Sequence, residues 1–148
     1  MGESWKYATI CKQTDKIYDV EVYNLSENFK NKLQKYFDKP TIDSLIFKFN
    51  NVKGEDIICS QKKIKLISYT KAIEKLKRNH KLSLDKLATK PKYKYVVFFI
   101  SSPIYFKEYA IIQSSESITR SNSITFLYLL KKYQGNWVYV DILQSSAS

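Results

Sequence analysis

KYKYVVFFISSPIYFKEYAIIQSSESITRSNSITFLYLLKKYQGNWVYVDIL, residues 92–143, is the stretch that decides the fold class. It contains four apolar runs separated by short polar stretches. Apolar runs of this length that are rich in β-branched and aromatic residues are typical of strands. The stretch therefore predicts four consecutive strands in an antiparallel meander.

The last two of these strands, residues 124–133 and 137–143, are predicted to pair around Gln134-Gly135-Asn136, a three-residue loop with one left-handed position at Gly135 or Asn136. This loop places Tyr133 opposite Trp137, Lys131 opposite Tyr139 and Leu129 opposite Asp141. The predicted core face then holds the even-numbered residues Ile124, Phe126, Tyr128, Leu130, Val138, Val140 and Ile142, with Lys132 as its one charge. The opposite, amphipathic face is predicted to bind a partner or to be covered by another layer, and it holds Leu127, Leu129, Lys131, Tyr133, Trp137, Tyr139 and Asp141.

The preceding residues predict helices and further strands. Residues 5–12 alternate as a strand, and residues 15–23 form either a second strand or an early helical turn. Apolar residues then recur every four positions, which predicts a helix that begins near Ser26 and stops at Pro40. The alternation over residues 41–50 predicts an extended segment.

Short strands at residues 57–59 and 64–68, or one bent strand, are followed by a predicted helix over residues 69–80. An ordered connection leads from there to Pro91. The pattern as a whole predicts an α+β fold in which two helices pack on one face of a twisted antiparallel sheet with a C-terminal four-stranded meander. At 148 residues, we expect a single domain, residues 1–148, with its own core.

The net charge of +11 points to an anionic partner such as nucleic acid. Only Arg78 and Arg120 carry the guanidinium group that phosphate recognition favours, and the other cations are lysines. A chain rich in lysine, isoleucine, asparagine and tyrosine is also what an AT-rich genome encodes. The charge therefore indicates nucleic acid as one partner class without deciding between the two explanations.

The sequence argues against several kinds of catalytic or metal site. His80 is the only histidine, and no glycine-rich phosphate loop or nucleophile elbow is present. Cys11 and Cys59 lack metal-ligand spacing and are either a disulfide or two buried thiols. We expect no cofactor and no metal, and the chain is not predicted to be an enzyme.

The polar residues 114–123 are predicted to be the loop between the two middle strands. Ser114, Ser115 and Arg120 could bind an anion or another polar ligand there, close to the lysines at positions 90, 92 and 94. The alternative is a solvated loop without a ligand.

No apolar run is long enough to span a membrane, and the first ten residues lack the apolar core of a signal peptide. We therefore expect a cytoplasmic protein as the sequence stands, or an exported one if a signal segment was removed.

Two C-terminal motifs, SSPIYFKEYAIIQ (residues 101–113) and FLYLLKKYQGNWVYV (residues 126–140), resemble a loose group of uncharacterised small bacterial proteins. The matching residues are Ser101, Pro103, Ile104, Tyr109, Ala110, Ile111, Leu127, Tyr128, Leu129, Leu130, Lys132, Gly135 and Trp137. Tyr105 stands where that group usually has phenylalanine, and serine and asparagine replace the cysteine and glycine common in its middle loop. The resemblance covers about a third of the chain and implies the meander without implying an activity.

These observations favour a non-enzymatic binding protein of bacterial type, for example a toxin-neutralising (immunity-type) protein that binds another protein. Its binding surface would be the open sheet face or the serine-rich loop. The alternative is a basic RNA-binding domain, or a metal-independent RNA-cleaving domain that uses His80, Arg120 and Tyr139 or Lys131.

Overall fold

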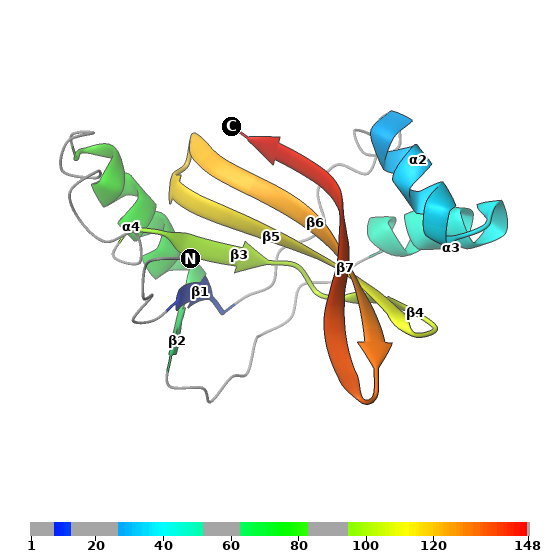
Figure 1. Ribbon diagram of the computed structural model, residues 1–148. Helices are drawn as coiled ribbons and strands as arrows, with labels where there is room; N and C mark the ends of the chain where they lie inside the picture. Colours follow the sequence, from blue (N-terminus) through cyan, green and yellow to red (C-terminus); the bar gives the residue numbers. More distant parts are fainter. Residues whose placement is uncertain (1–7, 13–26, 52–62, 83–94, 148) are drawn as a thin grey trace.

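The structure of the protein is a computed structural model that describes residues 8–12, 27–51, 63–82 and 95–147 (Figure 1). Its elements are, in chain order, β1 (Ala8–Cys11), α2 (Glu27–Tyr36), α3 (Lys39–Asn50), β2 (Ile64–Ile67), α4 (Tyr69–His80), β3 (Val97–Ile100), β4 (Ile104–Phe106), β5 (Tyr109–Thr119), β6 (Asn122–Tyr133) and β7 (Asn136–Ala147). The predicted α+β class is confirmed.

The strands form one mixed sheet in the order β2-β1-β3-β5-β6-β7, and β4 pairs with the first residues of β5. Strands β3, β5, β6 and β7 are antiparallel neighbours, as the meander predicts. The sheet is mixed beyond this meander, because β1 runs parallel to both β2 and β3. The helix α4 supplies the crossover connection that parallel strands require, since it leads from β2 toward β3.

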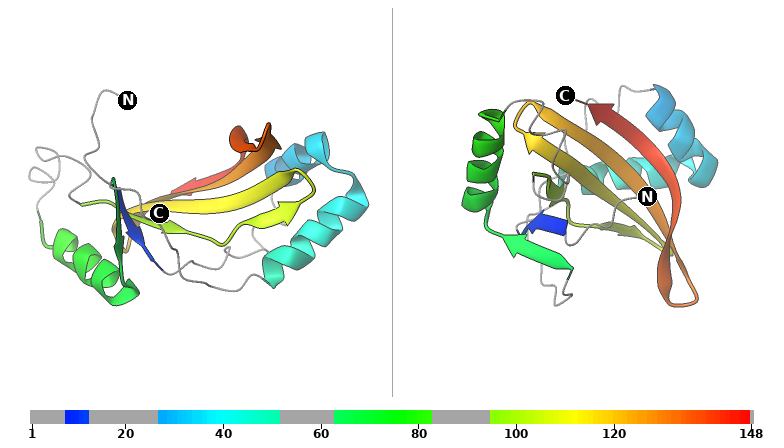
Figure 2. Two further views of the ribbon diagram at one scale, coloured as in Figure 1. Left: turned by 90° about the horizontal axis from the view of Figure 1, so that it is seen from below. Right: turned by 60° about the vertical axis from the view of Figure 1, so that its left-hand side comes forward.

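Figure 2 shows α3 and α4 toward the two ends of the same side of the sheet. Two apolar clusters lie beneath the three described helices. The first cluster joins α2 and α3 to the sheet and consists of Phe29, Leu33, Phe37, Leu45, Phe49, Ile104, Ile111, Leu127, Leu129 and Leu143. Under α4, the cluster consists of Cys11, Ala72, Leu76, Val97 and Phe99. The two predicted helices are therefore three in the described residues, and all three contribute to the core.

The predicted core face of the last hairpin is wrong. Leu127 and Leu129, placed on the outer face by the alternation, are 0% exposed, whereas Ile124 of the predicted core face is 42% exposed. The strand β6 is apolar on both faces, so its pattern cannot show which face receives the helices. The tertiary contacts of Leu127 and Leu129 with the α2 and α3 cluster decide the question.

The hairpin loop also differs from the prediction, because it has two residues, Gln134 and Gly135, both with positive φ (49° and 81°). Tyr133 consequently pairs with Asn136 instead of Trp137. A bulge between Leu129 and Leu130 then restores the predicted pairing of Leu129 with Asp141. The predicted odd-numbered face is thus divided: Trp137 and Tyr139 share a face with Lys132 and Leu130, and Asp141 shares the helix-covered face with Leu129.

The serine-rich residues 114–123 are not a loop. β5 continues to Thr119, the chain turns at Arg120 and Ser121, and β6 begins at Asn122. The hydroxyl groups of Ser115 and Thr125, both buried, form a hydrogen bond of 2.8 Å between the two strands. Such cross-strand hydroxyl pairs stabilise a sheet, which explains why a polar segment continues the strand.

Residues 41–50 are also helical instead of extended, because they belong to α3. Asp38 caps this helix by accepting a hydrogen bond of 3.0 Å from the Thr41 N–H, and Pro40 lies in its first turn. The first predicted helix therefore ends earlier than expected, at Tyr36, and Pro40 lies at the start of α3 instead of at the end of α2. Leu45 and Phe49 are four residues apart and both buried, so the same apolar residues satisfy a helical period.

The predicted helix over residues 69–80 and strand near 64–68 are confirmed. Cys11 is buried, as both alternatives for the cysteines allow. The predictions for Ser26, Cys59 and residues 15–23, 57–59 and 84–91 lie outside the described residues.

Candidate nucleic-acid interface

The predicted site residues of the last hairpin separate into three groups. Leu127 and Leu129 are fully buried and cannot contact a partner. Tyr133, Trp137 and Tyr139 are exposed near the hairpin tip, together with Tyr105 of β4, whose ring centroid lies 5.7 Å from that of Trp137. Lys132 lies over the Trp137 ring at 5.9 Å, and Lys131 forms an ion pair of 3.6 Å with Glu108. Tyr105, Trp137 and Tyr139 thus form an aromatic surface beside Lys132, whereas Tyr133 and Lys131 lie on the opposite face of the hairpin.

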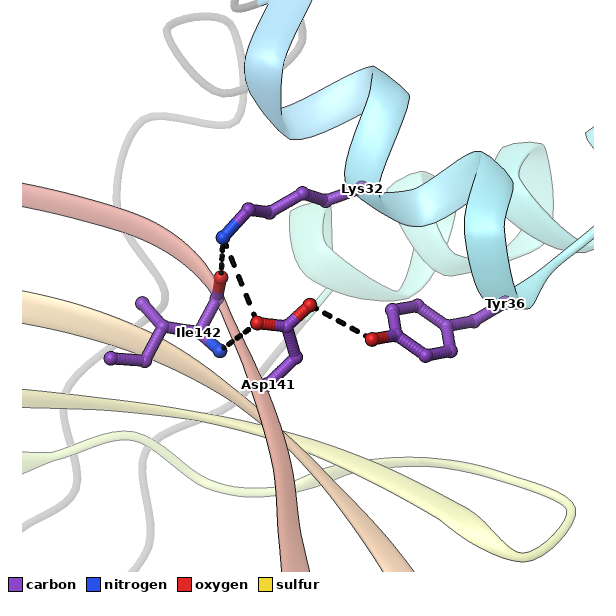
Figure 3. A network of polar contacts seen from close by, with 4 residues as sticks. All are labelled: Lys32, Tyr36, Asp141 and Ile142. Carbon is purple, nitrogen blue, oxygen red and sulfur yellow. Dashed lines mark hydrogen bonds and ion pairs between the residues drawn. The ribbon is translucent and has the colours of Figure 1, made fainter.

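Asp141, the remaining hairpin residue, anchors α2 on β7 (Figure 3). Its carboxylate accepts hydrogen bonds of 2.8 Å from the Tyr36 hydroxyl and of 2.8 Å from the Ile142 N–H. The Lys32 Nζ lies 3.7 Å from the same carboxylate and donates to the Ile142 carbonyl. The Tyr36 hydrogen bond, and then Lys32, hold the pKa of Asp141 below its usual value, and this bond raises the pKa of Tyr36. Asp141 therefore has a structural role within the described residues.

Of the serine-rich residues, Ser115 faces the interior and Ser114 is half-buried on the opposite face, so the two do not converge on one ligand. Arg120 is exposed in the turn between β5 and β6. There it lines a cavity of about 440 Å³ against the C-terminal half of α4, with Leu76, Lys77, His80, Lys81 and Ser121. The structure thus brings His80 and Arg120 together in one cavity. Tyr139 belongs to β7, and the tip of the β6–β7 hairpin lies away from α4 in Figure 1.

A second, larger cavity lies on the other side of α4, between this helix and strands β1 and β2. Five cationic side chains line it, accompanied by the carboxylate of Glu74: Lys12, Lys65, Lys71, Lys75 and Arg78. The cavity on the Arg120 side adds the three cations Lys77, Lys81 and Arg120 and no carboxylate among its described lining residues. Of the two arginines of the chain, Arg78 therefore lies on α4 and Arg120 beside it, one in each cavity.

The amphipathic sequence of α4 places these cations outward. Ala72, Leu76 and Asn79 are buried on the sheet side, whereas most of the charged residues between them are exposed. The Asn79 amide donates hydrogen bonds of 2.8 Å to the Tyr95 carbonyl and 2.7 Å to the Ile118 carbonyl. These two bonds fix the end of the helix to the chain before β3 and to β5. The helix that carries the basic residues is therefore held in a defined position on the sheet.

The sequence contains a signal for this surface in the spacing of its basic residues. Lys71, Lys75 and Arg78 follow one another at spacings of four and three residues, which places them on one side of the predicted helix. The approach of Lys12, Lys65 and Arg120 could not be predicted, because it depends on the crossover of α4 and on the turn after β5.

No family model, curated protein or solved structure matches the chain. The resemblance of the C-terminal motifs to small bacterial proteins therefore stays a prediction. Among the described residues, no helix is long and apolar enough to span a membrane. No group of three or more potential metal ligands occurs within the same residues.

Proposed function

We propose that this protein binds nucleic acid without cleaving it and that the basic surface around α4 contacts the phosphates. The supporting observation is the gathering of eight cationic side chains around one helix, with Glu74 as the carboxylate among the residues that line the two cavities. A surface of one sign attracts a polyanion and holds it by releasing counterions. The net charge of +11 has the same sign and strengthens the long-range attraction.

The composition of the surface favours phosphate contacts over the reading of bases. Six of the eight cations are lysines, which act as mobile point charges, and the two arginines supply planar donors that fit a phosphate. Phosphate contacts carry no sequence information. We therefore expect binding that depends steeply on salt and weakly on base sequence.

The test is fluorescence anisotropy with labelled single-stranded RNA and DNA oligonucleotides, measured between about 50 and 200 mM salt. The Lys77→Glu/Lys81→Glu variant should weaken binding by about tenfold or more and lower the salt slope by about 1.4, because each lost single-strand contact removes about 0.7.

The matched control is Lys35→Glu/Lys39→Glu, which changes two exposed lysines near the α2–α3 junction. Each lysine-to-glutamate exchange lowers the charge by two, so both variants carry +7 instead of +11. Equal losses in the two variants would show that only net charge matters, and an absence of binding at low salt would refute the proposed function.

A protein partner is the second candidate, and the exposed aromatic residues of the hairpin tip favour it. Tyr105, Tyr133, Trp137 and Tyr139 are each between 39% and 61% exposed. Aromatic residues are enriched in protein interfaces, and the lysines beside them suit an acidic surface. An adjacent toxin gene would identify the partner. The wild-type protein, but not Trp137→Ala/Tyr139→Ala, should then restore growth to cells that express this toxin, and equal rescue by both would refute the assignment.

A further inference from the structure

The cavity between α4 and strands β1 and β2 has the features of a built anion site. Its volume is about 700 Å³, and its described lining includes five cations and the Glu74 carboxylate. Strand residues supply Lys65 and Thr9 from one side, and the helix supplies Lys71, Lys75 and Arg78 from the other. Cations on opposing elements can surround an anion, which a single charged helix face cannot do.

Thr9 gives an independent indication of a ligand. This residue is 1% exposed and lines the cavity, yet its hydroxyl has no hydrogen-bond partner among the described residues. Nearly all buried polar groups in proteins have a partner, and one that does not calls for an explanation such as a bound water or ion. Thr9 pairs with Lys65 across the parallel strands, so the two side chains are directed to the same face of the sheet.

The electrostatics of the cavity also favour an anion. Partial burial, and then the neighbouring charges of Lys65 and Arg78, lower the pKa of Lys75. The fold thus holds ammonium and guanidinium groups together against their mutual repulsion. An anion between them removes that repulsion and accepts their hydrogen bonds.

We propose that this cavity binds a phosphate monoester, namely the terminal phosphate of a nucleic-acid strand, an assignment that rests on the proposed function. A monoester carries about −1.5 to −2 charge at neutral pH and has three acceptor oxygens. An internal phosphodiester carries a single negative charge and is satisfied by lysines on an open surface. The larger charge of the monoester matches the five cations, and its additional oxygen can accept from the Thr9 hydroxyl.

The experiment compares oligonucleotides of one sequence with a 5′-phosphate, a 3′-phosphate or hydroxyl groups at both ends, by anisotropy at fixed salt. The wild-type protein should prefer a phosphorylated end by about tenfold, the ratio expected for charge-assisted hydrogen bonds with one extra charge. Equal affinity for all three oligonucleotides overturns the inference and leaves the proposed function intact. No binding of any of them at low salt overturns the proposed function itself.

Single substitutions test whether the preference for a phosphorylated end arises in this cavity. Thr9→Val removes the buried hydroxyl at nearly constant shape and should reduce the preference by about three- to tenfold without lowering stability. Lys75→Gln should also reduce this preference. Lys77→Gln, on the other side of α4, should weaken the binding of all three oligonucleotides equally. An unchanged preference in both Thr9→Val and Lys75→Gln overturns the assignment to this cavity.

Calorimetric titrations with inorganic phosphate and with a nucleoside monophosphate distinguish a strand end from a small phosphate. Both should bind more weakly than the phosphorylated oligonucleotide, because they lack the further phosphates that contact the surface of α4. Tighter binding of either small ligand overturns the assignment to a strand end.

Discussion

The Asp141 contacts predict a stability loss that can be worked out from the structure. Asp141→Ala removes two hydrogen bonds of 2.8 Å to a charged group and an ion pair of 3.7 Å. Hydrogen bonds to charged groups contribute about 1.5–3 kcal/mol each when buried, and a partly exposed ion pair adds well below 1 kcal/mol. The Asp141 side chain is 24% exposed, so water recovers part of this loss. We expect a destabilisation of about 2–3 kcal/mol and a Tm lower by roughly 4–12 °C.

Urea denaturation followed by circular dichroism measures this loss. Tyr36→Phe should cost about 1–1.5 kcal/mol, and the double variant should reveal a coupling of about 1 kcal/mol, because both changes remove the same hydrogen bond. The control is Asp43→Ala on the exposed side of α3, with an expected change below about 0.5 kcal/mol. An Asp141→Ala protein as stable as the control, or a coupling near zero, would refute the reasoning.

The pH dependence of the free energy of unfolding follows from the two pKa shifts. The pKa of Asp141 lies below the ordinary 3.8, so its stabilising contribution is complete above that value and is lost as the pH falls below it. The pKa of Tyr36 lies above the ordinary 10.0, so the contribution of its neutral form is complete below pH 10 and is lost at still higher pH. In the Asp141→Ala variant, the free energy of unfolding should change less with pH in both the acidic and the alkaline range.

Three further tests of the fold compare the urea midpoints of five variants. Leu127→Ala should cost about 3–4 kcal/mol because the side chain is fully buried, whereas Ile124→Ala should cost less than about 1 kcal/mol; the reverse order would restore the predicted core face. Gln134→Asn should stabilise by about 0.5 kcal/mol, since asparagine tolerates the positive φ of this turn better, and Gly135→Ala should destabilise by about 1 kcal/mol from backbone strain alone. Asn79→Ala should cost about 2–4 kcal/mol because two carbonyls lose their donor, and hydrogen exchange should accelerate around α4.

The apolar periodicity was sufficient to predict the secondary structure where it fitted only a helix or only a strand. The helix over residues 69–80 has an apolar stripe that only a helical period explains, and α4 has these bounds. Residues 41–50 satisfy both periods, since Leu45 and Phe49 can alternate along a strand or lie one turn apart on a helix. The Asp38 cap and the contacts with the α2 cluster select the helix.

The candidate site was less predictable than the fold. Trp137 and Tyr139 are exposed on the hairpin, whereas Leu127 and Leu129 of the same predicted face are in the core and Asp141 is bonded to α2. The basic surface of α4 combines residues that are distant in the sequence, such as Lys12, Lys75 and Arg120. Charge counts show that such a surface is possible but not where it forms.

The sequence by itself determined the α+β class and the antiparallel pairing of the last strands, because apolar spacing and short connections act locally along residues 95–147. Only the tertiary structure decided which face of that meander receives the helices, since β6 is apolar on both sides and burial depends on what packs against it. The same is true of the cations, whose proximity in space follows from the parallel crossover through α4. It is this crossover that places Thr9 and five cations around one cavity.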